Sequence, residues 1–522
     1  MRIWFSDWWS RPVVLLALVA GLLGLVVQSG ELGSADTQHR MQTTHSLWTS
    51  EPPVWPSDYP EFGLVGRHGE LESWYGIGQS LLTLPADVVG TWAERRAVFA
   101  GYAGVDPGVR NIVISISTNV GLSVLTAVVC FGFLGQMGFG VRERVAGVLA
   151  LLFGTTHLHY TQSMMENNFI FLLTLVGFSQ QYKWLRTGER EGLLVGSAAF
   201  GLNLLTRLTT GLDLLCGALF LVGVMALEGF SWAAVWSKVK AYLAIAVPVV
   251  AAFGIADRVY QYRRFGSFFN TYITIFGEQA RRRDPSLPVK YPFETPFHEG
   301  FFGALLQPQK SIFLFDPLLV VMVLVGFFGW KKFSAPVKAY LVAATVMVVA
   351  YISFYARYTV WSGDFAWGDR YVETAAQFAA LLAVPLLVRF GAGLSKAVRG
   401  TARALVAGSV AVQAASVAFW CPLELYQRMT PGHTAFVVAL RFENIAAFAL
   451  GRMERWGLVN AFMRQDPWDW AHITTWNFLP CVLGRVGVAP VSVVRMFEVV
   501  WVGAVVGLGW GLLRLWRVVR EE

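Results

Sequence analysis

Long apolar runs separated by short polar segments dominate this chain. A helix needs about 20 mostly apolar residues to cross the hydrocarbon core of a bilayer, and runs of that kind predict about twelve membrane-spanning helices. They cover residues 12–29, 110–136, 144–160, 166–182, 191–206, 210–228, 239–258, 312–330, 337–356, 373–390, 402–420 and 493–514. Arg207 and Asp213 interrupt the pair between 191 and 228, so the apolar pattern is least regular there.

The composition agrees with a polytopic membrane protein. A mean hydropathy of +0.50, with 55% hydrophobic and 15% charged residues, excludes an ordinary soluble domain. The first run is similar to a signal peptide. It lacks a convincing small-residue cleavage site and further runs follow it, so we interpret it as a retained anchor. The predicted fold is therefore all-α, and the 21 Trp residues fit interfacial belts.

Basic residues in the short loops predict the orientation, because cytoplasmic loops carry an excess of Lys and Arg. They gather in every second loop and in the tail: Arg142 and Arg144; Lys183, Arg186 and Arg190; Lys238 and Lys240; Lys331, Lys332 and Lys338; Arg389, Lys396, Arg399 and Arg403; Arg514, Arg517 and Arg520. With both termini in the cytoplasm, all of them fall on the cytoplasmic side. The net charge of +8 belongs mostly to loops, and no nucleic-acid partner is expected.

The long loops would then lie outside. One of them contains a predicted interfacial helix over about 74–103, interrupted at Pro85. No domain boundary or repeat stands out, so we predict a transmembrane region over 1–420. A cap-like segment (421–492) and the final span make up the rest, 421–522. The long outer loops cover residues 30–109, 259–311, 357–372 and 421–492.

The four Cys are too few for a disulfide framework. Cys130 and Cys216 lie inside apolar runs, where a Cys usually behaves as a small buried apolar residue. Cys421 and Cys481 both fall near one membrane face, and the sequence leaves open whether they pair.

Asp36 follows the first span by a few residues, in GSADTQHR (33–40). A carboxylate at this place is held at the membrane surface, where it can meet both a lipid-borne group and a water-soluble one. Asp36 is therefore a candidate catalytic acid or base.

A second carboxylate, Glu166, lies at the start of the fourth predicted span, in HLHYTQSMMENN (157–168). Ionisable residues at membrane depth are costly and usually face a polar cavity. His157 and His159 lack the i, i+4 spacing of a helical zinc pair. We therefore predict no metal ligands here, and expect these residues and Tyr160 to contact a substrate.

Several cations lie on the outer side, against the bias that orients the chain. Long loops translocate whatever their charge, so Arg281–Arg283 could be a solvated turn or an anion site. Lys310 comes directly before a span, where it would meet phosphate at headgroup level. Arg207, at the outer turn between two spans, could neutralise Glu166 or bind an anion.

The segment WSGDFAWGDRY (361–371) precedes another span on the same side. Its density of Gly, Asp and Trp favours a binding loop containing Trp367 and Asp369, with Arg370 as a phosphate contact. A snorkelling anchor is the alternative interpretation of Arg370.

Asp36, Glu166, Arg207, Lys310 and Arg370 thus fall on one face from five separate segments. A carboxylate activates a hydroxyl by accepting its proton, and cations stabilise a departing phosphate. This combination suits transfer of a sugar from a lipid phosphate.

Over roughly residues 10–390 the chain resembles the GT-C superfamily of integral-membrane glycosyltransferases. The resemblance is in particular to bacterial relatives of protein O-mannosyltransferases and of the lipid A aminoarabinose transferase. It rests on the order and membrane sidedness of several short segments. They are Asp36 after the first span, GELESWYGIGQSLLTLPADVVG (69–90), HLHYTQSMMENN (157–168), LLTRLTTG (204–211), QPQKSIFLFDPLL (307–319) and WGDRY (367–371).

This resemblance implies a polyprenyl-phosphate-sugar donor, an inverting displacement and an active site on the periplasmic face of a bacterial inner membrane. By position, Asp36 matches the catalytic aspartate of the first loop. Glu166 matches the acid of the second loop, where many relatives have Asp, and Tyr75 is expected to contact substrate. Some relatives hold a divalent metal on these carboxylates and others do not, so no cofactor is assigned. The family's large soluble C-terminal domain has no counterpart beyond 421–492, which leaves the acceptor (lipid, glycan or protein) unassigned.

A transporter or flippase of lipid-linked sugar is the alternative from another functional class. Carriers usually show internal repeats and charged residues near the midplane. Here no repeat is visible and the unusual charges gather on one face, which favours an enzyme. A non-catalytic relative that binds lipid-linked sugar is also compatible with the sequence.

Overall fold

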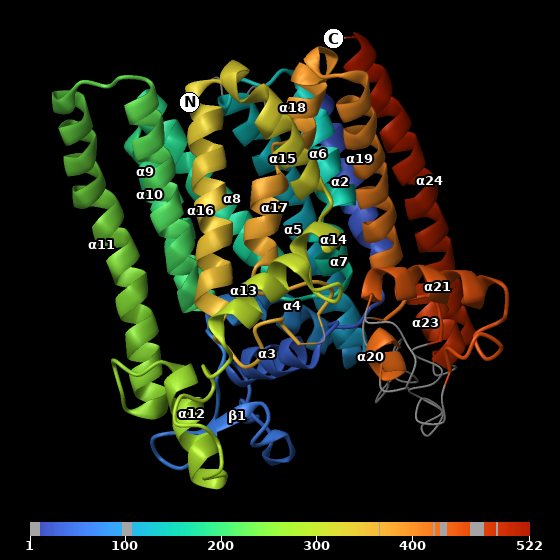
Figure 1. Cartoon of the computed structure of the whole chain (residues 1–522). Helices are drawn as coiled ribbons and strands as arrows, with labels where there is room; N and C mark the ends of the chain where they lie inside the picture. Colours follow the sequence, from blue (N-terminus) through green and yellow to red (C-terminus); the bar gives the residue numbers. More distant parts are fainter. Residues whose placement is uncertain are drawn as a thin grey trace.

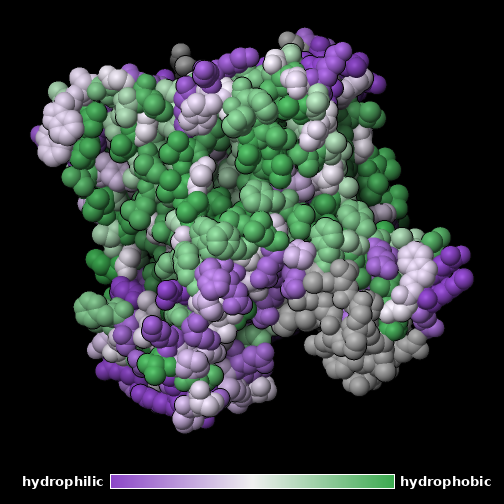
Figure 2. Space-filling model, viewed as in Figure 1, coloured by the Kyte–Doolittle hydropathy of each residue, from purple (hydrophilic) through white to green (hydrophobic). Residues whose placement is uncertain are grey.

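The computed structural model describes residues 11–96, 107–364, 366–420, 423–428, 436–459, 474–486 and 489–521. Most of these residues form helices that run side by side in one bundle (Figure 1). An apolar band crosses the middle of the bundle, and hydrophilic residues gather at its two ends (Figure 2). Such a surface is expected where acyl chains, rather than water, surround the middle of the bundle.

The helices that run along the bundle coincide with the apolar runs of the sequence. They are α2 (Arg11–Val27), α5 (Val109–Gln136), α6 (Val141–Gly154), α8 (Asn167–Thr187), α9 (Arg190–Thr206), α10 (Gly211–Leu227), α11 (Trp232–Phe265), α15 (Leu318–Gly329), α16 (Ala335–Tyr355), α17 (Glu373–Ala380), α18 (Ala383–Phe390), α19 (Lys396–Ser416) and α24 (Val491–Glu521).

Six described helical segments are long and apolar enough to cross a membrane. They are Val109–Gln136, Leu208–Leu227, Trp232–Phe265, Ala335–Tyr355, Glu373–Gly393 and Val491–Glu521. The helices in the other predicted ranges are shorter or less apolar, although they lie in the same bundle (Figure 1). The predicted helical membrane fold is therefore confirmed, and the number of twelve spans stays a prediction.

Two predicted spans contain a break at a proline. Pro385 has no N–H to donate to the carbonyl of Leu381, and the helix is divided there into α17 and α18. Pro317 separates α14 (Ile312–Phe315) from α15, because the residue before a proline is disfavoured in the helical conformation.

The labelled termini lie at one end of the bundle, and the opposite end, here called the outer end, carries most of the shorter elements (Figure 1). There α3 (Ala35–Ser46) contacts α4 (Gly78–Glu94), and β1 (Gly63–Val65) pairs antiparallel with β2 (Leu71–Ser73). The remaining short elements are η1 (Pro56–Asp58), α7 (His157–Gln162), η3 (Leu208–Thr210), α12 (Tyr272–Arg283), α13 (Phe297–Leu306), η4 (Trp330–Lys332), η5 (Gly391–Gly393), α20 (Leu423–Arg428), α21 (Val437–Ala449) and α23 (Leu479–Val486).

The predicted interfacial helix exists as α4, but the expected interruption at Pro85 is wrong. Pro85 lies inside a continuous helix, because contacts with α3 and α5 support α4 along its length and offset the one missing hydrogen bond. Cys130 and Cys216 are buried free thiols, as expected. Cys481 is also a free thiol, and Cys421 lies outside the described residues.

The orientation can be tested with single cysteines placed at the two ends of the bundle. Thr187 and Ser286 are both exposed; Thr187 is the last residue of α8, and Ser286 lies in the loop after α12. In a background without the native cysteines, an impermeant maleimide should label Ser286→Cys in intact cells. It should label Thr187→Cys only after permeabilisation, because the basic loops hold that end in the cytoplasm. The reverse pattern would show that the outer end faces the cytoplasm.

Candidate active site

A cavity of about 230 Å³ lies at the outer end of the bundle. Its wall contains two carboxylates and three guanidinium groups, and the other side chains are mainly aromatic. The lining residues are Asp36, Arg40, Trp74, Tyr75, Gly76, Glu166, Thr206, Arg207, Leu208, Thr209, Thr271, Tyr272, Ile273, Phe276, Phe293, Phe354, Tyr355, Tyr358, Arg370 and Tyr371. Five predicted site residues are therefore brought together from separate segments: Asp36, Tyr75, Glu166, Arg207 and Arg370.

Asp36 lies in the first turn of α3, and a tight turn before the helix sets its place. Gly33 has a φ of +83°, and a Cβ there would lie 2.6 Å from the backbone of Ser163, so glycine is required. The Ser34 hydroxyl accepts a hydrogen bond of 3.2 Å from the N–H of Thr37 and caps the helix. The turn thus brings α3 directly against the segment that leads to Glu166.

Two groups hold the Asp36 carboxylate. Arg370 forms an ion pair with Oδ2, and the Tyr75 hydroxyl donates a hydrogen bond of 2.7 Å to Oδ1. Burial opposes ionisation of Asp36. The charges of Arg370 and Arg40, together with the hydrogen bond from Tyr75, outweigh burial and lower the pKa below its usual value. Asp36 is therefore ionised at neutral pH, as a proton acceptor must be.

Glu166 is the N-cap residue of α8, and only 2% of its surface is exposed to solvent. One carboxylate oxygen pairs with Arg207, and the other lies 2.5 Å from Arg40 Nη1. A buried carboxylate without such partners would be an uncompensated charge at high cost. Of the two roles left open for Arg207, the ion pair with Glu166 is therefore observed.

Arg40 was not among the site residues predicted from the sequence. It follows Asp36 by four residues in α3, and this spacing puts both side chains on one helical face. Its guanidinium lies over the Tyr75 ring, 4.3 Å from the ring centroid. The i, i+4 spacing within GSADTQHR was the signal that could have identified Arg40.

Aromatic rings form much of the remaining wall. Tyr355 and Tyr371 stack with their centroids 4.4 Å apart, and the Tyr355 hydroxyl lies 2.9 Å from the Thr209 hydroxyl. Trp74 meets Phe276 edge to face at 5.1 Å. A mainly apolar wall with a few converging charged groups is the usual lining of a small-molecule site.

Lys310 is not part of the cavity wall. Its buried ammonium donates hydrogen bonds to the backbone carbonyls of Asp364, Ala366 and Gly368, at 2.7, 2.8 and 3.0 Å. An ammonium has three donors, so these contacts engage all of them within the protein. They shape the loop before Arg370, and a direct contact of Lys310 with phosphate stays a prediction.

Four other residues predicted to contact substrate are buried outside the cavity wall: His157, His159, Tyr160 and Trp367. His159 stacks on Trp367 with centroids 6.0 Å apart, and the Tyr160 hydroxyl donates to the Trp367 carbonyl at 3.2 Å. His157 is fully buried as well. His159 and Tyr160 pack the short helix α7 against the loop that carries Arg370, whereas His157 lies beside Phe171 of α8.

Asp369 is also buried, directly before Arg370. Its Oδ1 accepts a hydrogen bond of 3.2 Å from the N–H of Tyr371, and burial raises the pKa of Asp369 to about 7. Among the six residues predicted to contact substrate, Tyr75 is the one that lines the cavity.

The Arg281–Arg283 triplet ends α12 and lies outside the cavity wall. Arg281 donates to the carbonyls of Val289 and Tyr291 at 3.0 and 2.9 Å, and Arg283 donates to the Tyr59 hydroxyl at 3.1 Å. These positions exclude the triplet from the cavity wall, and the two interpretations, a solvated segment and an anion site at the outer membrane surface, both stay open.

Within the described ranges, no group of three or more His, Cys, Asp or Glu is arranged to hold a metal ion. Guanidinium groups already stand beside Asp36 and Glu166, so a divalent metal would have to displace them.

No family model matches this chain, and no curated protein sequence matches it. Its fold is similar to the crystal structure of ArnT from Cupriavidus metallidurans bound to undecaprenyl phosphate. The TM-score is 0.42 and the sequence identity 14%, over 96% of this chain and 77% of that chain. At so low a similarity, function has to be argued from the residues of the cavity.

The buried ion pairs of Glu166 predict a specific loss of stability. Arg207→Ala should lower the free energy of unfolding by about 1.5–3 kcal/mol, because Glu166 would stay buried with Arg40 as its remaining partner. Reversible unfolding in SDS micelles measures the change. Adding Glu166→Gln should restore part of the loss, since the amide carries no charge.

Arg282→Ala is the matched control for this experiment. Arg282 is exposed and lies outside the cavity, so its loss should change stability by less than about 0.5 kcal/mol. Equal losses in the two variants would contradict a stabilising pair between Arg207 and Glu166.

Proposed function

We propose that this protein transfers a sugar from a polyprenyl-phosphate-linked donor to an acceptor on the periplasmic side of a bacterial inner membrane. One observation carries the proposal: Asp36 and Glu166 line a single cavity with three arginines at the outer end of an apolar bundle. A proton acceptor and a cationic pocket are the two parts that displacement at a sugar phosphate needs.

Asp36 is the proposed general base. It accepts the proton of the acceptor hydroxyl while the hydroxyl oxygen attacks the anomeric carbon of the donor. The bond from that carbon to the phosphate oxygen breaks, and the lipid phosphate leaves with the bonding electrons. The hydrogen bond from Tyr75 orients the carboxylate for this step. When Asp36 takes up the proton it loses its charge, and its ion pair with Arg370 is broken. The guanidinium of Arg370 is then free to bind the leaving phosphate.

Arg40, Arg207 and Arg370 are the proposed phosphate contacts. With the two carboxylates, the three arginines give the cavity wall a net charge of 3 − 2 = +1, which complements the single negative charge of a phosphodiester. Lys310 is assigned to support of the loop before Arg370, because its ammonium donates to three carbonyls of that loop.

An apolar groove of about 620 Å³ follows α13, α15 and α16 and is the proposed place of the polyprenyl chain. Ile352 lines the groove, while Phe354 and Tyr355, further along α16, line the cavity. A polyprenyl chain in this groove would stay in apolar surroundings while its phosphate reaches the arginines. The aromatic walls beside Tyr75 offer a surface for the sugar ring.

Asp36→Asn should abolish transfer and leave folding and membrane insertion intact. Turnover is measured as polyprenyl phosphate released from a panel of polyprenyl-phosphate hexoses and pentoses. A loss of about a thousandfold fits removal of a base that also orients the acceptor. Asp284→Asn, an exposed outer aspartate, is the control and should keep full turnover. Near-normal turnover of Asp36→Asn would remove the catalytic role.

The proposed phosphate contact predicts weaker donor binding. Arg370→Ala should lower the affinity for polyprenyl phosphate in nanodiscs by about 1.5–3 kcal/mol, or about 10–150-fold. Lys310→Ala should weaken binding less, through the loop that it supports. Arg282→Ala should bind like the unaltered protein. If acceptor affinity falls in Arg370→Ala while polyprenyl phosphate affinity holds, the phosphate contact lies elsewhere.

A further inference from the structure

The helix that carries Asp36 and Arg40 is polar almost throughout. Apart from Ala35 and Met41, every residue of α3, ADTQHRMQTTHS, is polar or charged. Apolar packing therefore contributes little to the position of α3, and hydrogen bonds to neighbouring helices determine where Asp36 and Arg40 lie.

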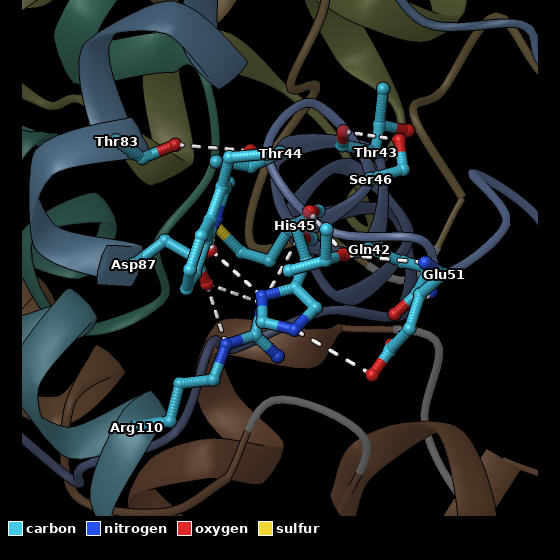
Figure 3. A network of polar contacts seen from close by, with 12 residues as sticks. Gln42, Thr43, Thr44, His45, Ser46, Glu51, Thr83, Asp87 and Arg110 are labelled. Carbon is cyan, nitrogen blue, oxygen red and sulfur yellow. Dashed lines mark hydrogen bonds and ion pairs between the residues drawn. The ribbon is translucent and has the colours of Figure 1, made fainter. Parts of the chain in front are cut away.

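Asp87 of α4 accepts one of these hydrogen bonds, from His45, and two more from Trp48, just after α3, and Arg110, which itself contacts α3 (Figure 3). Its side chain is fully buried; Oδ2 accepts from His45 Nδ1 at 2.9 Å and from Trp48 Nε1 at 2.7 Å. Oδ1 accepts from Arg110 of α5 at 2.5 Å, and Arg110 Nη2 also donates to the Met41 carbonyl at 3.1 Å. One carboxylate thus ties α3 to both α4 and α5.

The helix α4 is polar on its buried side and apolar on its exposed side. Thr83 and Asp87 are fully buried, whereas Leu82, Val89 and Trp92 are 41%, 54% and 58% exposed. Leu82 and Val89 also line an apolar groove of about 370 Å³ along α5, which is long and apolar enough to cross a membrane. Acyl chains fit such a face, so a bilayer would hold α4 from outside.

We propose that Asp87 is a positioning residue for the transfer reaction. With His45, Trp48 and Arg110, it fixes α3 on the membrane-facing helix α4 and thereby places Asp36 at the cavity. This inference rests on the proposed function. Arg207 and Arg370 lie on other elements, so displacement of α3 moves the base while leaving two of the three phosphate contacts in place.

Asp87→Asn keeps the size of the side chain and removes the charge that binds His45 and Arg110. A misplacement of about 1 Å can cost about 100-fold in rate, so kcat should fall about 10–100-fold. The dissociation constant for polyprenyl phosphate should change far less. Hydrogen exchange of the α3 amides should become faster, whereas that of the amides in α16 should not change.

A second experiment separates positioning from a general loss of structure. Tyr75→Phe removes another contact that orients Asp36, so Asp87→Asn and Tyr75→Phe should together cost less than the product of their separate effects on kcat. Independent, multiplicative effects would overturn the proposal. A loss of polyprenyl phosphate affinity as large as the loss of kcat would overturn it as well.

Two further variants complete the test. Asp257→Asn changes another buried aspartate, which pairs with Arg258 on α11 outside the cavity, and should keep its kcat. Should Asp87→Asn fail to fold, Trp48→Phe removes one donor to Asp87 and should lower kcat in the same direction by a smaller factor. An unchanged kcat in Trp48→Phe would then overturn the proposal.

The outcomes also distinguish this inference from the proposed function. If Asp36→Asn is inactive while Asp87→Asn keeps its kcat, the positioning role is wrong and the transferase function stands. If Asp36→Asn keeps its turnover, the transferase mechanism itself is wrong.

Discussion

Neutralisation of two carboxylates at the outer end of the bundle is the constraint on which the rest of the site depends. Glu166 is buried and Asp36 is largely enclosed, and neither could stay ionised there without a guanidinium beside it. Their partners are Arg40, Arg207 and Arg370. The first outer loop, the start of α8, the turn after α9 and the loop before α17 must therefore meet at one place.

The same requirement gives the cavity its two kinds of surface. Charged groups gather where these four segments meet, and tyrosines from α12, α16 and the neighbouring loops close the remaining sides. A ligand with one anionic group and one flat, weakly polar part complements such a wall. A lipid phosphate carrying a sugar has both features. The apolar groove along α16 also complements the lipid chain of such a ligand.

Around this cavity the membrane reverses the usual distribution of polar and apolar residues. In α4 the polar side chains face the protein and the apolar ones face outward, which is stable only where the surroundings are acyl chains. The polar helix α3 can therefore rest on hydrogen bonds with α4 and α5, and Asp87 of α4 accepts hydrogen bonds from His45, Trp48 and Arg110. The position of Asp36 and the placement of the protein in its bilayer are thus linked.

Much of the cavity could be predicted from the sequence, but not all of it. Asp36 and Glu166 were found because charges beside long apolar runs are conspicuous, and Arg207 and Arg370 because they stand against the orientation bias. Arg40 was missed, since an arginine in a polar outer loop is common, and its i, i+4 spacing from Asp36 indicates a shared face only if this segment is helical. Lys310 was placed at phosphate level from its distance to a span, which says nothing about which acceptors its ammonium meets.

The sequence by itself determined the helices, the apolar band and the end of the bundle at which the charges gather. These properties depend on the local run of residues, because each backbone group in a membrane is satisfied within its own helix. Only the tertiary structure decided which cation neutralises which carboxylate. It also decided that His159, Tyr160, Trp367 and Asp369 form or contact the loop before α17, and that His157 is buried beside Phe171, instead of lining the cavity. Those outcomes depend on contacts between segments distant in sequence, such as that between Asp36 and Arg370. The local pattern of apolar and polar residues does not specify such contacts.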